Sequence, residues 1–242
     1  MNVELIDLSG KKALVTGASS GMGRAVAVEL AHAGVDCALI GRDQSRLDET
    51  ANACADAGHD AHPVICELDK IDAIESAVRE ANEKLGGLNI LVNSGGVHAD
   101  GKAHEVQLSE WDRMLDVDFR AIYHLIHHAL QVIIKEPGGA VVNIGGITFP
   151  YPGGGMLMGV KRALSGYSEA LFEDVREYGV KVCTINPGFV NTPMVKSDRI
   201  VRERMIQPED VARTVMYVLT MSEATCPTEI TLRPQRSPYK KS

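Results

Sequence analysis

The regular alternation of short apolar runs with longer helical patterns constrains the fold of this chain more than any other feature. Strand-like runs rich in β-branched residues lie at 12–16, 36–41, 61–66, 88–93, 139–144, 180–185 and 228–232. Helical patterns lie near 21–33, 44–57, 71–85, 109–135, 155–178 and 208–221. Most runs are apolar throughout, which is typical of parallel strands covered on both faces. Because parallel neighbours are joined by right-handed crossovers, the pattern predicts an α/β fold with a doubly wound parallel sheet of about seven strands and helices on both faces.

The bulk composition is that of one globular domain. The chain has 242 residues, of which 45% are apolar and 24% charged, and it shows no repeat or linker, so we expect a single domain over 1–242. The net charge of −7 repels phosphate backbones and anionic lipids, so neither nucleic acid nor a membrane is expected as a partner. The first residues lack a basic segment and no apolar stretch is long enough to span a bilayer, which favours a cytoplasmic location.

Local patterns add smaller structural predictions. Ser109 with Asp112 resembles a capping box, and Pro208 suits the first position of a helix. The five cysteines are odd in number and contain no CxxC pair, so we expect reduced thiols that are mostly buried. Residues 233–242 are polar, basic and proline-bearing, which predicts a loosely ordered tail.

A glycine-rich turn follows the first strand-like run and opens the first helical pattern. It reads TGASSGMGRA from Thr16 to Ala25. In a dinucleotide-binding turn Gly17 allows the tight bend, Gly21 lets the backbone approach a pyrophosphate, and Gly23 lets the helix pack against the strand. The helix N-terminus also presents free N–H groups and partial positive charge to phosphate. The turn therefore predicts a nicotinamide dinucleotide site.

The end of the second strand bears on which dinucleotide is bound. Folds that prefer NAD usually place an acidic residue there to hold the ribose 2′-hydroxyl. Here the strand ends at Gly41 and Arg42, and a guanidinium is suited to a 2′-phosphate. We therefore favour NADP(H), while Asp43 beside it leaves NAD(H) as the alternative.

Three segments together resemble the short-chain dehydrogenase/reductase family. These are TGASSGMG, then LVNSGGV at 91–97, which looks like the family's NNAG segment, and INPGFVNTPM at 185–194, which looks like its PG motif. The resemblance implies a single Rossmann-like domain, commonly a homodimer or homotetramer packed through the helices at 109–135 and 155–178. It also implies that the dinucleotide is held by Thr16, Gly17, Ser19, Ser20, Gly21, Met22, Gly23, Arg42, Glu67, Leu68, Asn93, Gly95, Lys161, Pro187, Gly188, Val190 and Thr192.

Three of the four catalytic positions that the resemblance implies are changed in this chain. Family members that interconvert ketones and alcohols use Asn, Ser, Tyr and Lys, the last two as Y-x-x-x-K on one helix face. Lys161 is retained, but Leu157 stands four residues before it and exchanges no proton. The serine position falls on Gly146, or on Gly145 if the register slips by one, with Thr148 the nearest hydroxyl. The asparagine position holds Asp118.

Other side chains are candidates to replace the missing groups. His98 follows the LVNSGGV segment, and Tyr151 lies in the loop before the Lys161 helix; the alternative for each is a solvent-facing side chain. Asp118 is a candidate base if burial raises its pKa, and otherwise a helix-surface or water-binding carboxylate. His124, His127 and His128 share a helix, but without an HExxH arrangement we expect no metal site.

These observations leave three functional hypotheses. The first is an NADP(H)-dependent oxidoreductase of this family with a non-standard proton donor, acting on a small molecule that the sequence does not identify. The second is a catalytically inactive, nucleotide-binding pseudoenzyme that forms a hetero-oligomer with an active relative. The third is a cofactor-dependent catalyst of a non-redox reaction, such as a cyclase or lyase, because a fold does not fix its chemistry.

Overall fold

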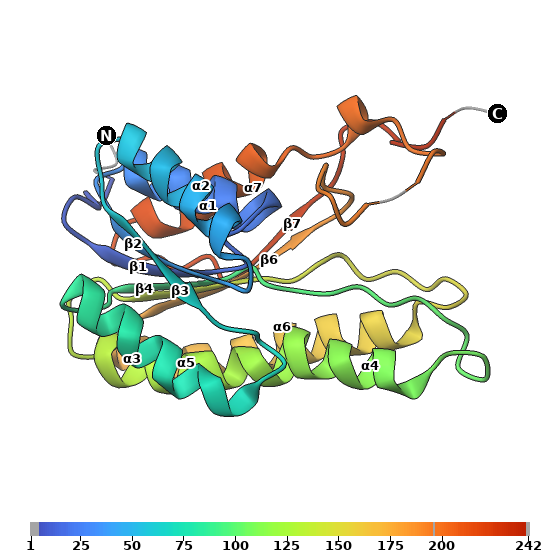
Figure 1. The fold of residues 1–242 in the computed structure, drawn as a ribbon, viewed down its shortest axis with the longest axis horizontal. Helices are drawn as coiled ribbons and strands as arrows, with labels where there is room; N and C mark the ends of the chain where they lie inside the picture. The colour runs from blue at the N-terminus through green and yellow to red at the C-terminus, as the bar shows by residue number, and fades with distance from the viewer. Residues whose placement is uncertain (1–4, 196, 241–242) are drawn as a thin grey trace.

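The computed structural model describes residues 5–195 and 197–240, and a seven-stranded parallel sheet forms its centre (Figure 1). The strands are β1 (Lys12–Thr16), β2 (Asp36–Gly41), β3 (Ala61–Ile65), β4 (Ile90–Asn93), β5 (Ala140–Ile144), β6 (Lys181–Pro187) and β7 (Glu229–Leu232). Their order across the sheet is β3-β2-β1-β4-β5-β6-β7, and every neighbouring pair is parallel. The predicted doubly wound α/β fold is therefore confirmed.

Helices cover both faces of the sheet (Figure 1). One face carries α1 (Gly21–His32), α2 (Gln44–Asp56) and α7 (Pro208–Thr220). The other carries α3 (Ile74–Leu85), α4 (Leu108–Leu115), α5 (Ala121–Ile133) and α6 (Gly155–Val175). Shorter turns are η1 (Ile71–Ala73), η2 (Asp116–Arg120), η3 (Arg176–Tyr178) and η4 (Arg202–Arg204). Within the described ranges, no helix is long and apolar enough to cross a membrane.

The pleat of each strand divides its side chains between two separate cores. In β1, Ala13 and Val15 pack toward α1 and α7, whereas Leu14 packs toward α3 and α5. In β4, Ile90 and Leu91 point to opposite faces in the same way. Burying one such Leu or Ile side chain contributes about 1.5–3 kcal/mol. This two-sided burial explains why the strands are apolar throughout instead of alternating with polar residues.

Helix boundaries differ from the sequence prediction in two places. The predicted helix at 109–135 is divided by the π-helical turn η2, so that α4 and α5 are separate helices. The helix α4 begins at Leu108 with Gln107 as its N-cap, so the capping box expected at Ser109 is wrong. A capping box occurs instead before α7, where Gln207 and Asp210 bond each other's backbone N–H groups, and Pro208 holds the predicted first position.

The C-terminal segment is held more firmly than its composition predicts. The N–H of Val201 donates to the carbonyl of Pro238 at 2.8 Å, and the N–H of Lys240 donates to that of Arg199 at 2.9 Å. Ile200 and Tyr239 form an antiparallel bridge between the same two segments. These backbone bonds fix the chain as far as Lys240, so a loose tail over 233–242 is not what the described residues show, and residues 241–242 lie outside them.

Candidate functional site

The candidate site lies at the carboxyl ends of the strands, where the strand order reverses between β1 and β4. Open α/β sheets bind ligands at such switch points, because the loops after the two strands turn to opposite faces and leave a crevice. In Figure 1 the loops that follow β4 and β5 extend from this end of the sheet. They are joined by a bond from the N–H of Gly101 to the carbonyl of Gly153, at 3.0 Å.

The glycine-rich turn after β1 is packed too closely to admit side chains. Gly17 has φ +64°, and a Cβ there would lie 2.7 Å from the Cα of Gly95. A Cβ on Gly23 would lie 2.4 Å from the carbonyl oxygen of Gly17. The hydroxyl of Thr16 accepts bonds from the N–H groups of Ser94 and Gly95, both at 3.1 Å. The turns after β1 and β4 are thereby locked together.

The N-terminus of α1 presents unoccupied backbone donors beside this turn. Ser20 is the N-cap, and its side chain makes no capping hydrogen bond. Gly21 has φ +55°, and a Cβ there would lie 3.1 Å from Cγ2 of Thr192. Ser19 and Met22 flank these residues and are half-buried. An uncapped helix N-terminus lined by glycine fits the pyrophosphate of a dinucleotide, and Thr192 from the segment after β6 lies against it.

The turn after β4 retains buried polar atoms without a partner. The side-chain amide of Asn93, which is 1% exposed, donates to Oδ1 of Asn143 at 2.8 Å. Oδ1 of Asn93 and the hydroxyl of Ser94 have no hydrogen-bond partner within the described part of the chain. Leu68 packs so close to Gly95 that a Cβ on Gly95 would lie 2.5 Å from its Cδ1. Buried unpaired polar atoms are costly, so this turn fits the polar edge of a bound nucleoside.

Two charged residues follow each other at the end of β2, Arg42 and Asp43, and the carboxylate of Asp43 already makes contacts within α2. Arg42 follows directly from Gly41 and is exposed. The carboxylate of Asp43 caps α2 by accepting a bond from the N–H of Arg46 at 3.2 Å, and it lies 3.8 Å from Nε of that residue. Glu67, which follows β3, is exposed at the neighbouring strand end. Because the carboxylate of Asp43 already contacts Arg46 within α2, the exposed guanidinium of Arg42 is the cationic group at the end of β2 that a ligand can reach.

Lys161 is held by a buried carboxylate. Its Nζ lies 2.9 Å from Oδ2 of Asp118, whose side chain is 1% exposed, against 14% for Lys161. Oδ1 of Asp118 accepts a bond from the N–H of Val97 at 2.7 Å. Asp118 lies in the π-helical turn η2, and its bond to Val97 joins this turn to the LVNSGGV segment. Both of its oxygens are thus engaged, and it connects three segments of the site.

The positions expected to hold serine and tyrosine lie beside Lys161. The N–H of Gly146 donates to Oδ1 of Asn186 at 3.0 Å. A Cβ on Gly146 would point toward Lys161, 3.7 Å from its Cε, whereas a Cβ on Gly145 would lie 2.4 Å from Oδ1 of Asn186. Gly146, and not Gly145, therefore faces the lysine. Leu157 is half-buried one turn before Lys161 on α6.

His98 and Tyr151 both contact Asp100, a residue that was not predicted from the sequence. The hydroxyl of Tyr151 donates to Oδ1 of Asp100 at 2.7 Å, and Nε2 of His98 lies 3.0 Å from Oδ2. Burial, followed by this bond to Asp100, raises the pKa of Tyr151 to about 12. The only sequence signal for Asp100 is its spacing two residues after His98. The three side chains tie the loops after β4 and β5 together.

The segment after β6 borders the crevice on the side of β5 and β7. The N–H of Ile147 donates to the carbonyl of Pro187 at 3.0 Å, and the N–H of Gly188 donates to that of Leu232 at 2.9 Å. Val190 is buried and pairs with Ile206. The residues expected from the PG motif therefore lie between the segments after β5 and β7.

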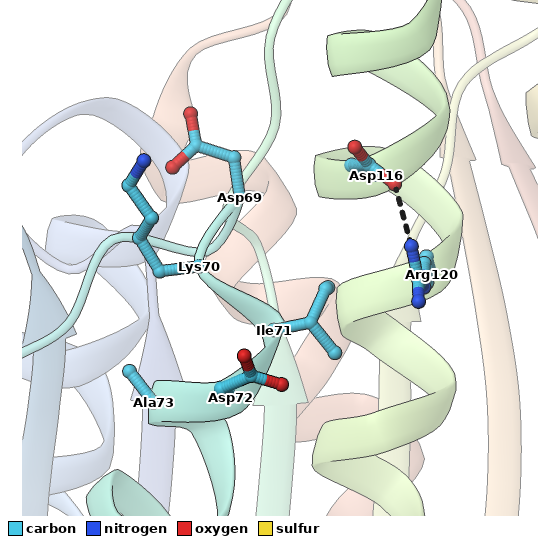
Figure 2. A pocket seen from close by; sticks show the side chains of 7 residues that line it. All are labelled: Asp69, Lys70, Ile71, Asp72, Ala73, Asp116 and Arg120. Carbon is cyan, nitrogen blue, oxygen red and sulfur yellow. Dashed lines mark ion pairs between the residues drawn. The ribbon is translucent and has the colours of Figure 1, made fainter.

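Two hollows lie apart from these residues. Figure 2 shows one of about 610 Å³ between η1 and η2, lined by Asp69, Lys70, Ile71, Asp72, Ala73, Asp116 and Arg120. Asp116 and Arg120 form an ion pair at 3.6 Å there. Another, of about 640 Å³, is lined by Ser197, Asp198, Ile200, Val201, Arg202, Glu203 and Lys240. None of the residues expected to bind the dinucleotide lines either hollow. Across 5–195 and 197–240, no three His, Cys, Asp or Glu side chains are arranged to hold a metal ion.

Comparison with known proteins gives consistent matches over nearly the whole chain. Residues 11–202, which include strands β1 to β6, match the family described as short chain dehydrogenase. An uncharacterized oxidoreductase of Staphylococcus aureus (strain MRSA252) is 31% identical over 94% of this chain and 98% of its own. A short chain dehydrogenase from Burkholderia cenocepacia J2315, solved in complex with NADP, has a TM-score of 0.88 at 28% identity, covering 95% of this chain and 98% of that chain. A short-chain dehydrogenase/reductase from Serratia marcescens BCRC 10948 has a TM-score of 0.88 at 26% identity, with the same coverage of 95% and 98%.

Proposed function

We propose that this protein, which belongs to the short chain dehydrogenase family, binds NADP(H) and carries out oxidoreduction with a non-standard proton donor. The observation that carries the proposal is the contrast around Lys161. The glycine-rich turn and the lysine are kept, while the two positions that should hold hydroxyls beside the lysine are Gly146 and Leu157. When bound, the nicotinamide supplies or accepts a hydride. The protein has to provide the proton from elsewhere.

The choice of NADP(H) over NAD(H) rests on the end of β2. The exposed guanidinium of Arg42 is suited to a bidentate contact with a 2′-phosphate. Asp43, the residue that could favour NAD(H), caps α2 instead. The structural relative from Burkholderia cenocepacia, which was solved with NADP, supports the same choice.

Lys161 and Asp118 divide binding and positioning between them. The ammonium of Lys161 is placed to donate to the ribose next to the nicotinamide, as in the family. Asp118 uses both oxygens on Val97 and Lys161, at 2.7 and 2.9 Å, so each oxygen already holds a group of the site in place. We therefore assign Asp118 to positioning Lys161 and the loop after β4.

His98 is our candidate for the proton donor. It follows Val97, whose N–H is bound to Asp118, so the chain carries His98 to the edge of the Lys161 site. Asp100 holds Nε2 of its ring at 3.0 Å, so that Nδ1 faces away from this contact. When both ring nitrogens are protonated, Nδ1–H is the proton that His98 donates to a substrate, and the neutral ring keeps Nε2–H toward Asp100. Tyr151 is less suited, because a phenol whose pKa is raised to about 12 is a weak donor near neutral pH.

Restoring the two missing hydroxyls tests this proposal. A Cβ on Gly146 would make only ordinary contacts, so the chain has room for Gly146→Ser, which we combine with Leu157→Tyr. We expect this double variant to oxidise NADPH with a panel of ketones about 10²-fold faster than the unmodified protein, or more. The matched control, Gly146→Ser with Leu157→Phe, adds a ring without a hydroxyl and should show no gain.

Two outcomes would change the proposal. If the unmodified protein reduces ketones as fast as the double variant, the proton relay has not been lost. If it binds NADPH but turns over nothing in the panel, the protein is better described as a nucleotide-binding subunit without catalysis.

We also propose that the protein forms homo-oligomers through α5 and α6. Small exposed residues follow one face of α6, at Gly155, Gly159, Ala163, Gly166 and Ala170. Their spacing of three and four residues places them in line, where another helix could approach closely. Sedimentation analysis should give a dimer or tetramer for the unmodified protein and a smaller species for Ala163→Arg. A monomer in both samples would contradict this arrangement.

A further inference from the structure

Aromatic residues are scarce in this chain, yet two ring pairs lie at the candidate site. The sequence has 4 Phe, 6 Tyr and 1 Trp. Phe149 and Tyr151 have ring centroids 5.6 Å apart, and Phe189 and Tyr239 are also 5.6 Å apart. Phe149 is 46% exposed and Tyr239 is 50% exposed, so these two rings are not packed inside the hydrophobic core. Exposed aromatic rings in pairs are suited to packing against a further ring.

The two ring pairs come from segments that meet at the carboxyl end of the sheet. Phe149 and Tyr151 follow β5, and Phe189 follows β6, while the bond from Ile147 to Pro187 joins these two segments at 3.0 Å. Tyr239 belongs to the C-terminal segment that pairs with Ile200. Burial and Asp100 have the larger effects on the pKa of Tyr151, and the phenol of Tyr239 raises it further. Both pairs therefore border the same end of the crevice, next to the Lys161 site.

Several residues close to Lys161, on α6 and after β5, are apolar. Gly146 and Leu157 stand where hydroxyl groups are expected, and Met156 and Met158 beside them on α6 are half-buried. The charge of Lys161 is neutralised by Asp118 at 2.9 Å. Because Lys161 is paired with Asp118, it offers no unpaired positive charge to an anionic ligand. A neutral apolar ligand, in contrast, would displace water from the apolar surface.

We propose that this site takes a small neutral molecule with an aromatic ring, of the aryl ketone or aryl alcohol class. Its ring packs against the Phe149–Tyr151 and Phe189–Tyr239 pairs, with the oxygen-bearing carbon toward Lys161. The inference rests on the proposed function, because it takes the Lys161 end of the crevice as the place where the substrate meets the nicotinamide.

Binding of acetophenone, measured by saturation-transfer NMR on protein saturated with NADP⁺, tests the inference without requiring turnover. Cyclohexyl methyl ketone is the matched probe, because it keeps the size and the carbonyl and removes the aromatic ring. We expect acetophenone to bind about 3- to 10-fold more tightly than its saturated counterpart. Phe149→Leu and Tyr239→Leu should each weaken acetophenone binding by a similar factor. Tyr178→Leu should leave it unchanged, because Tyr178 is 59% exposed and lies in η3 before β6 begins, at the opposite end of that strand from Phe189.

The results separate this inference from the proposed function. Equal binding of the two ketones, or unchanged acetophenone binding in both leucine variants, would overturn the aromatic-ring inference while leaving NADP(H) binding in place. A separate titration without ketone decides whether NADP⁺ binds. Absence of NADP⁺ binding would overturn the proposed function, and the acetophenone measurement on the free protein would still decide whether the rings hold an aromatic ligand.

Discussion

At the scale of single residues, the site around Lys161 is a consistent set of changes. With Gly146 and Leu157 in place of hydroxyl-bearing residues, the ammonium of Lys161 has no phenol to act on. Asp118 lies at the position where the resemblance implies a neutral amide, and it pairs directly with the lysine at 2.9 Å. A buried cation without a partner would be costly. Asp118 therefore supplies the partner that Lys161 needs and fixes the position of its ammonium group.

The role proposed for Arg42 gives the first residue-scale prediction. Arg42→Ala should weaken NADPH binding about 10-fold or more and leave NADH binding unchanged, because hydrogen bonds to a charged phosphate are worth about 1.5–3 kcal/mol. Calorimetric titration of both nucleotides measures this difference. Arg46→Ala is the control, since Arg46 already lies 3.8 Å from Asp43. An unchanged preference for NADPH in Arg42→Ala would assign the 2′-phosphate to another group.

Residue identities in the site were predictable where they depend on spacing along one element. The four-residue step predicts that Leu157 and Lys161 share one helix face, and both residues do lie on α6, one turn apart. The serine position remained open between Gly145 and Gly146 until the structure showed which faces Lys161. Asp100 was missed, because its two partners come from different loops and no local pattern records that contact.

At the scale of elements, the turn η2 gives the second prediction. It brings Asp118 to Lys161, so Asp118→Ala leaves a mostly buried ammonium uncompensated, with 14% of the lysine side chain exposed. We expect unfolding in urea to show a loss of about 3 kcal/mol. The exposed pair Asp116–Arg120 lies on the same turn, and Asp116→Ala should cost less than about 1 kcal/mol. Equal losses in the two variants would contradict a special role for Asp118.

The helix boundaries show where sequence patterns stop being informative. The apolar periodicity of 109–135 predicted one helix, because the residues of α4 and α5 share a helical pattern. The π-helical turn between them depends on Asp118 reaching Val97 and Lys161, two segments distant in the sequence. Such a tertiary contact is outside any local pattern. By contrast, Pro208 at the start of α7 was predictable, because its missing N–H suits that position whatever surrounds it.

At the scale of the whole molecule, the buried thiols predict a loss of stability in alkali. Burial raises the pKa of Cys183 from 9.0 to about 12 and that of Cys54 from 9.0 to about 11. The unfolded chain releases these protons from about pH 9 while the folded protein retains them. The contribution to stability is therefore complete below pH 9 and is lost as the pH rises toward the folded-state pKa.

Urea unfolding at pH 9 and 10.5 measures this loss. We expect Cys183→Val, which removes one buried thiol, to lose about 1 kcal/mol less than the unmodified protein over that interval. Comparison with this variant isolates the thiol from lysines and tyrosines that titrate in the same range. The same pH dependence in both proteins would mean that Cys183 ionises as readily in the folded state as in the unfolded one.

The overall architecture was the most predictable level. Seven apolar runs alternating with helices specify a parallel sheet, because each strand must be covered on both faces. The C-terminal segment was less predictable, since its polar composition says nothing of the backbone bonds from Val201 to Pro238 and from Lys240 to Arg199. Those bonds place Tyr239 beside Phe189, so a segment expected to be loose contributes to the proposed ligand site.

We infer that the nucleotide half of the site is intact. A calorimetric titration of the unmodified protein with NADPH, and separately with NADH, tests it most directly. We predict saturable binding of NADPH at one site per chain. We expect NADH to bind more weakly than NADPH by at least about 10-fold. If circular dichroism shows that the protein is folded and neither nucleotide binds to it, the inference of an intact nucleotide site is wrong. The glycine-rich turn and Lys161 would then serve the fold alone.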